Sequence, residues 1–177
     1  MAIIVREPDG ASFPMIETGT YQGVCVEVVD MGMREQKAFE SDEIKMVPKI
    51  CIVWELSEKR DDGKNFVFCK EYKSSLHEKA GLRKDLDAWR GVPFTAEELK
   101  GFDLERVVGA NCMLTVSAYA KQNGHEGRKI TGVSKLMKGL EKIEKTAQYE
   151  RPKFINEILG IAHNDSDPIP SDDDIGF

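Results

Sequence analysis

Alternation of apolar and polar residues, the pattern of a strand with one buried face, marks much of this chain. Five segments follow it, at residues 20–30, 49–56, 65–73, 111–120 and 128–136. In the first of them, Val24, Val26 and Val28 share one side. Residues 31–47 carry many charges and a weaker period, so we expect a long loop or an irregular hairpin there.

Apolar residues spaced three and four apart predict helices after the third strand. The stretch Ser75–Glu78 has the sequence of a capping box, and Leu82, Leu86 and Trp89 supply the apolar face of a helix behind it. A second capping box at Thr95–Glu98 predicts a short helix. Both helices are expected to end at glycines.

The C-terminal part of the chain shows three successive patterns. Residues 138–149 are expected to be helical, and a short amphipathic stretch follows Pro152. Residues 164–177 consist mainly of Asn, Asp, Ser and Pro. Such a composition cannot offset the entropy cost of ordering the chain, so this tail is predicted to be disordered.

The order of these elements indicates a mainly β fold with helical insertions. Three strands, a helix, two strands and helical appendages form the layout of the OB-fold, a small five-stranded and partly open barrel. Other α+β domains also place a helix after three strands. We expect a barrel domain at residues 1–137, a helical extension at 138–163 and a disordered acidic tail at 164–177.

Charge is distributed unevenly along the chain. The formal net charge is -6, yet residues 164–177 hold five aspartates and no basic residue. Residues 121–153 hold nine basic and four acidic side chains. A nearly neutral body with a basic segment is compatible with a polyanionic ligand.

Several classes of function lack support in the sequence. No apolar run is long enough to span a membrane. The four cysteines form no CxxC pair and no export signal precedes them, so we expect reduced thiols in the cytoplasm. The histidines have no ligand spacing to these cysteines, and neither a metal nor another cofactor is expected. Motifs for phosphate loops, zinc proteases and nucleophile elbows are missing, so an enzyme is not expected.

The third strand combines aromatic and basic side chains. One of its faces carries Phe66, Phe68, Lys70 and Tyr72, and the other carries Val67 and Cys69. If the second face points to the core, the first forms a platform on which unpaired bases can stack while the lysine contacts phosphate. The alternative is that the two phenylalanines are ordinary core residues.

Two loops flank the binding face of an OB-fold, and both mix aromatic with basic residues here. The candidates in the first loop are Lys37, Phe39 and Lys45. Those in the second loop and the strand after it are Tyr119, Lys121, Arg128, Lys129 and Lys135. Surface loops are charged in any case, and the first also carries four acidic residues.

The end of the chain resembles the tip of a known protein family. Its last residues are Asp172, Asp173, Asp174, Ile175, Gly176 and Phe177. Bacterial single-stranded DNA-binding proteins end in aspartates followed by isoleucine, proline and phenylalanine, and Gly176 departs from that pattern. The stretch SLHEKAGLRKDLDAWRGVPFTAEEL resembles the helical segment of phage-encoded OB-fold single-stranded DNA-binding proteins.

This resemblance implies single-stranded DNA as the ligand and a tail that recruits a helicase, primase or nuclease. A terminal Phe presents a ring and a carboxylate together, which suits an apolar pocket beside a basic residue. The acidic tail is also expected to compete with DNA for basic side chains of its own protein.

The sequence therefore predicts a protein that coats single-stranded DNA without sequence preference during phage replication, repair and recombination in the host cytoplasm. The sequence does not determine whether the protein forms homo-oligomers. The alternatives are a strand-annealing or recombination-mediator protein, a nuclease or nuclease accessory factor, and a structural phage component.

Overall fold

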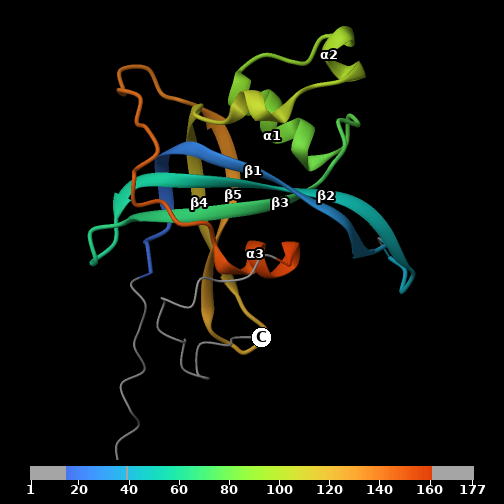
Figure 1. The fold of residues 1–177 in the computed structure, drawn as a ribbon, viewed down its shortest axis with the longest axis horizontal. Helices are drawn as coiled ribbons and strands as arrows, with labels where there is room; N and C mark the ends of the chain where they lie inside the picture. Colours follow the sequence, from blue (N-terminus) through green and yellow to red (C-terminus); the bar gives the residue numbers. More distant parts are fainter. Residues whose placement is uncertain (1–14, 39, 161–177) are drawn as a thin grey trace, which may run out of the picture.

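The computed structural model describes residues 15–38 and 40–160, and it is mainly β (Figure 1). The strands are β1 (Gly19–Lys37), β2 (Ile44–Lys59), β3 (Asn65–Lys73), β4 (Asn111–Ala120) and β5 (Glu126–Lys135). The helices are α1 (Gly81–Arg90), α2 (Ala96–Lys100) and α3 (Lys153–Leu159), with a 3-10 helix, η1, at Leu104–Val107. All strand pairs are antiparallel, and the sheet order is β3-β2-β1-β4-β5.

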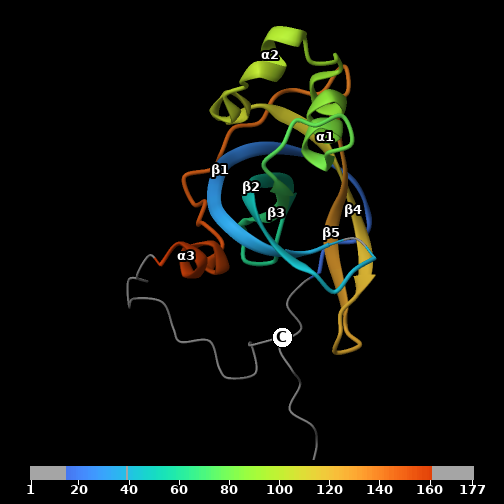
Figure 2. The same ribbon diagram turned by 90° about the vertical axis from the view of Figure 1, so that its right-hand side faces the viewer.

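The sheet is strongly curled. The β1–β2 ladder shifts register between Cys25 and Glu27 and again between Asp30 and Gly32, and such bulges bend a strand and increase its twist. Figure 2 shows β1 curving around the other strands. The edge strands β3 and β5 come into contact, but within the described residues they are not hydrogen-bonded to each other. The sheet is therefore not closed.

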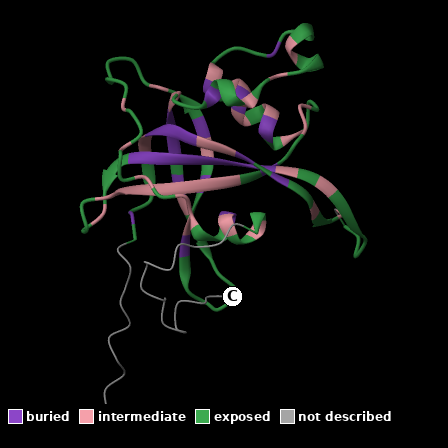
Figure 3. Cartoon of the chain, viewed as in Figure 1, coloured by how far each residue is buried: buried purple, intermediate pink, exposed green. Residues whose placement is uncertain are grey.

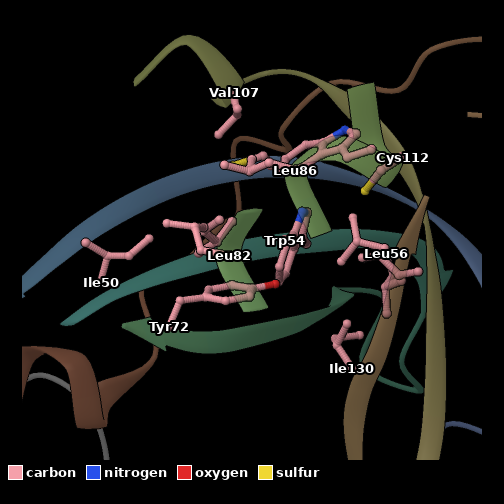
Figure 4. Close-up of a cluster of buried hydrophobic side chains, with 14 of the residues drawn as sticks. Ile50, Trp54, Leu56, Tyr72, Leu82, Leu86, Val107, Cys112 and Ile130 are labelled. Atoms are coloured by element: carbon pink, nitrogen blue, oxygen red, sulfur yellow. The ribbon is translucent and has the colours of Figure 1, made fainter. Parts of the chain in front are cut away.

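The main core lies inside this curl and beneath α1. Trp54 and Leu56 of β2 are fully buried there. The α1 side chains Leu82 and Leu86 lie next to them (Figure 4). Trp89 of α1 belongs to the same cluster, and its ring centroid lies 6.0 Å from that of Trp54. Because α1 contacts both β5 and β3, it covers the gap between the two edges of the sheet.

A second apolar cluster lies on the outer face of β1 and β2. It contains Val24, Cys51 and Val53, and Ile155 of α3 is fully buried against it. Figure 3 shows the burial along the middle of β1 and β2, and the exposed end of the β1–β2 hairpin. The chain from 138 to 160 is thus packed on the sheet and forms part of the folded body.

Most strands and helices lie where the sequence predicted them. The structure confirms five strands, a helix between β3 and β4, the capping box at Thr95 and the short helix after Pro152. Residues 31–47 are more regular than expected, because β1 continues to Lys37 and β2 begins at Ile44.

The capping box predicted at Ser75 is wrong. Helix α1 begins at Gly81, and Ala80 precedes it without a side-chain cap. Ser75 Oγ accepts a hydrogen bond from the backbone of His77, at 3.1 Å. The hydroxyl therefore stabilises a local turn, which is the common alternative role of such residues.

The helix predicted at residues 138–149 is also wrong, because this segment forms isolated turns and no helix. Its backbone bonds to the sheet instead. The side chain of Asn111 accepts from Ile143 N and donates to Ile143 O, both at 2.9 Å. Of the described part of the expected helical extension, only residues 153–159 are helical. The acidic tail lies outside the described residues.

Candidate nucleic-acid interface

The hairpin of β4 and β5 presents an aromatic ring beside two lysines. Tyr119 and Gly127 face each other in the ladder. A Cβ built at Gly127 would stand 2.6 Å from Tyr119 Cε1 and 2.9 Å from Lys121 Cε. Both side chains therefore lie directly against the backbone of Gly127. The ammonium group of Lys129 lies 5.4 Å from the centre of the tyrosine ring.

These three side chains are available to a ligand. Tyr119 is 38% exposed, and both lysines are exposed as well. Neither Lys121 nor Lys129 has an acidic partner among the described residues. Exposed, unpaired lysines attract phosphate by charge alone, and an exposed ring accepts a base of any identity. We call this surface, formed by Tyr119, Lys121 and Lys129, the hairpin site.

A pair of hydroxyl groups extends the same face of the sheet. Ser117 is opposite Lys129 in the ladder, and its Oγ lies 2.6 Å from Oγ1 of Thr131. Hydroxyl groups are frequent donors to phosphate oxygens. The hairpin site therefore continues into a polar surface without acidic side chains from these strands.

Arg128 has a structural role in the same hairpin. Its Nε donates to the carbonyl of Ile16 at 2.7 Å, and its Nη1 pairs with Glu126. Only 15% of the side chain is exposed. Arg128 thus ties the start of the described chain to β5, and its charge is already compensated.

The predicted platform on β3 faces the main core. Phe66 and Phe68 pack against that core while partly buried, and Tyr72 is only 4% exposed. The expectation of an exposed ring at Tyr72 is wrong for this structure. The opposite face of β3, with Val67 and Cys69, packs on the outer cluster. Sequence alone could not decide between two apolar faces of one strand.

The polar ends of this face are held by Asp85 of α1. Its Oδ2 accepts from Lys70 Nζ and from the Tyr72 hydroxyl, both at 2.7 Å. Burial raises the pKa of Tyr72, and the hydrogen bond to Asp85 raises it further. The phenol therefore stays a neutral donor, and Lys70 is compensated by a carboxylate.

The end of the β1–β2 hairpin differs from the expected cationic loop. Lys37 pairs with Asp42 at 2.8 Å, and Lys45 lies 4.0 Å from Glu43. Phe39 lies outside the described residues. Three apolar side chains of this hairpin are more than half exposed, namely Met33, Ile44 and Met46. Positive charge at this end is thus largely neutralised.

A second cationic site lies between α1 and the end of β5, where the sequence showed no local motif. It is a cavity of about 410 Å³. Its lining includes Trp89, Arg90, Phe102, Arg106, Lys135 and Lys142. Of these, only Lys135 was a candidate from the sequence. The others belong to separate segments that folding brings together, so no spacing along the chain could reveal them.

Comparison with known proteins adds no family to these observations. Neither the scan of protein-family models nor the search of curated proteins finds a match for this chain. Among the described residues, no group of three or more His, Cys, Asp or Glu side chains could hold a metal ion. No helix in the described part of the chain has the length and apolar character needed to cross a bilayer.

Proposed function

We propose that this protein binds single-stranded DNA without sequence preference and coats it during phage replication, repair and recombination. The observation that carries the proposal is the hairpin site. There, an exposed tyrosine ring lies against Gly127 beside Lys121 and Lys129, and neither lysine has an acidic partner among the described residues. Stacking on the ring and contact with phosphate both tolerate any base.

The fold supports this proposal through its connectivity. We propose that the curled sheet is a partly open OB barrel. Three consecutive strands, an α-helix and two more strands follow one another, and α1 covers the gap between β3 and β5. In the OB-fold, the connection between the fourth and fifth strands flanks the ligand, and the hairpin site lies on that connection.

The acidic end of the chain completes the proposal. Its aspartates, Ile175 and terminal Phe177 resemble the tip with which bacterial single-stranded DNA-binding proteins recruit partners. We propose the same role here, in the cytoplasm of a bacterial host, with a helicase, primase or nuclease as the recruited protein.

Fluorescence anisotropy with labelled oligothymidine of graded length tests the DNA-binding proposal. We expect tighter binding to single strands than to duplex, and a steep loss of affinity with added salt. Tyr119→Ala should weaken binding by about 1–3 kcal/mol, the contribution of one stacked base. Phe154→Ala, at an exposed ring on α3, is the matched control and should bind normally.

Two results would overturn the proposal. The first is an absence of oligothymidine binding at low salt. The second is a Tyr119→Ala protein that binds as tightly as the wild type while Phe154→Ala does the same, because the hairpin site would then contribute nothing.

A further inference from the structure

The cavity between α1 and β5, which we call the α1 pocket, is lined by both cationic and apolar side chains. Four of its side chains are cationic: Arg90, Arg106, Lys135 and Lys142. Its remaining walls are largely apolar or aromatic, and no acidic side chain lines it. A ligand that fits both features must combine negative charge with an apolar, planar part.

Most of this positive charge is uncompensated. Arg90 forms an ion pair with Glu98, at 2.6 Å between Nη2 and Oε2. Within the described residues, Arg106, Lys135 and Lys142 have no carboxylate partner. The Nη1 atom of Arg90 is buried without a hydrogen-bond partner in the described part of the chain. Because that atom is buried, it is not offered to a ligand, and the uncompensated charges that line the pocket are those of Arg106, Lys135 and Lys142.

One aromatic ring brings two of the cations together. The guanidinium carbon of Arg90 lies 5.5 Å from the centre of the Phe102 ring, and that of Arg106 lies 5.6 Å from it. Arg90 already pairs with Glu98, whereas Arg106 has no carboxylate partner among the described residues. The planar guanidinium group of Arg106 can bind phosphate oxygens in a bidentate manner.

Lysines also line the pocket. Lys135 packs its side chain against Gly91 at the end of α1, where a Cβ would stand 3.0 Å from Lys135 Cδ. Gly91 has a φ of 72°, which ends the helix and leaves space for that side chain. Lys135 is exposed, and its side chain lies against Gly91 where it lines the pocket.

The volume limits the size of the ligand. Small-molecule sites occupy about 300–1,000 Å³, so a cavity of about 410 Å³ suits a single small ligand. Inorganic phosphate would leave the apolar walls around Trp89 and Phe102 uncovered. An uncharged aromatic compound would leave the cations unpaired.

We propose that the α1 pocket binds one nucleotide, with its phosphate between Arg106, Lys135 and Lys142 and its base against Phe102. This extends the proposed function, because it is a second nucleotide site on the same protein. Lys129 and Lys135 are six residues apart on β5, which is about 20 Å along an extended strand. The α1 pocket and the hairpin site therefore take different nucleotides.

The nucleotide can be free or part of a DNA strand, and calorimetry on the full-length protein distinguishes these sources. The probes are dTMP, thymidine, inorganic phosphate, and oligothymidine with and without a 5′-phosphate. We expect dTMP to bind at least about tenfold more tightly than thymidine or phosphate, because only dTMP satisfies both the cations and the ring.

The variants are Arg106→Gln with Lys142→Gln, and Tyr119→Ala. Both residues of the double variant are exposed, and circular dichroism checks that it folds. The double variant should lose at least about tenfold in affinity for dTMP, whereas Tyr119→Ala should keep it. Lys79→Gln with Lys84→Gln, two exposed lysines near α1 that do not line the pocket, controls for net charge.

The outcomes separate the two proposals. Loss of dTMP binding in the pocket variant supports a site for free nucleotides. If dTMP does not bind but the variant loses a preference for 5′-phosphorylated oligothymidine, the site takes the end of a strand. If the pocket variant matches the charge control for every probe, the pocket proposal is overturned. A failure of the hairpin site alone would instead be seen as oligothymidine binding that Tyr119→Ala leaves unchanged.

Discussion

The ring of Tyr119 lies directly against the backbone of Gly127, and only the missing Cβ of the glycine allows this contact. Gly127 matters here because it has no side chain and so leaves room for the ring. It is not needed for its backbone conformation, since its φ lies outside the left-handed region. The side chain of Lys121 also occupies the space that a Cβ at Gly127 would need. One backbone position thus orients two of the three groups in the hairpin site.

Gly127→Ala should therefore weaken DNA binding with little change in stability. The added methyl group must displace the Tyr119 ring and the Lys121 side chain. Both would then be poorly placed to contact the bases and phosphates of bound DNA. We expect a loss of about 1–3 kcal/mol, as for removal of one stacked base, measured by anisotropy with oligothymidine. Gly101→Ala is the control, because a Cβ there meets nothing within 4 Å. Equal affinity of both variants would contradict this role of Gly127.

Deletion of residues 165–177 should strengthen DNA binding, most clearly at low salt. The deleted segment contains five aspartates, which compete with phosphate for the exposed lysines, and salt screens this competition. Titration of both proteins with oligothymidine at low and high salt measures the difference. A gain in affinity that persists at high salt, or a loss at low salt, would argue against competition by charge.

Glu27 should make the attachment of residues 149–151 sensitive to acid. Its Oε2 accepts from Arg151 Nε and from the Tyr149 hydroxyl, both at 3.0 Å. Partial burial raises the pKa of Glu27, but the hydrogen bonds from Arg151 and Tyr149 outweigh this, and the net pKa is lowered from 4.5. The stabilisation is therefore present at neutral pH and is lost as the pH falls below about 4.5 towards the folded-state pKa.

Urea unfolding of the wild type and Glu27→Gln from neutral pH to below pH 4 tests this expectation. The wild type should be more stable at neutral pH, and the difference should shrink on acidification because protonated Glu27 resembles glutamine. A difference in stability that is constant across this range would show that the carboxylate charge is irrelevant.

Thr146→Val should destabilise the protein measurably. Glu55 is only 2% exposed, and its carboxylate accepts from Thr146 N at 2.9 Å and from Thr146 Oγ1 at 3.0 Å. Removing the hydroxyl deprives a buried charged oxygen of its donor, which costs about 1.5–3 kcal/mol. Thr131→Val, at an exposed hydroxyl pair, should cost much less. Denaturant titration compares the two variants.

The strands were predictable because apolar and polar side chains alternate along them. The alternation of Val24, Val26 and Val28 predicts β1 without any tertiary information. The expectation that all three share one face is wrong, because the register shift between Cys25 and Glu27 places Val28 against the main core while Val24 and Val26 belong to the outer cluster. The face of β3 was not predictable, since Phe68 and Cys69 are both acceptable core residues. What decides it is Asp85, contributed by α1, which binds the polar ends of Lys70 and Tyr72.

The segment around Ile143 shows why periodicity failed at the C-terminal end. Its apolar spacing suits a helix, but the backbone of Ile143 bonds to Asn111, which is 32 residues away in the chain. Tertiary hydrogen bonds of this kind override weak helix propensity. The α1 pocket could not be predicted from the sequence for a related reason, because its cationic residues come together only when the chain folds.

The complete burial of Ile155 determines how short an autonomous version of this protein can be. A chain cut at residue 137 would leave an apolar strip around Val24, Cys51 and Val53 open to water, and strips of this kind promote aggregation. A chain that runs to Gly160 would keep the strip covered. The smallest unit that stays monodisperse on its own is therefore expected to extend through α3.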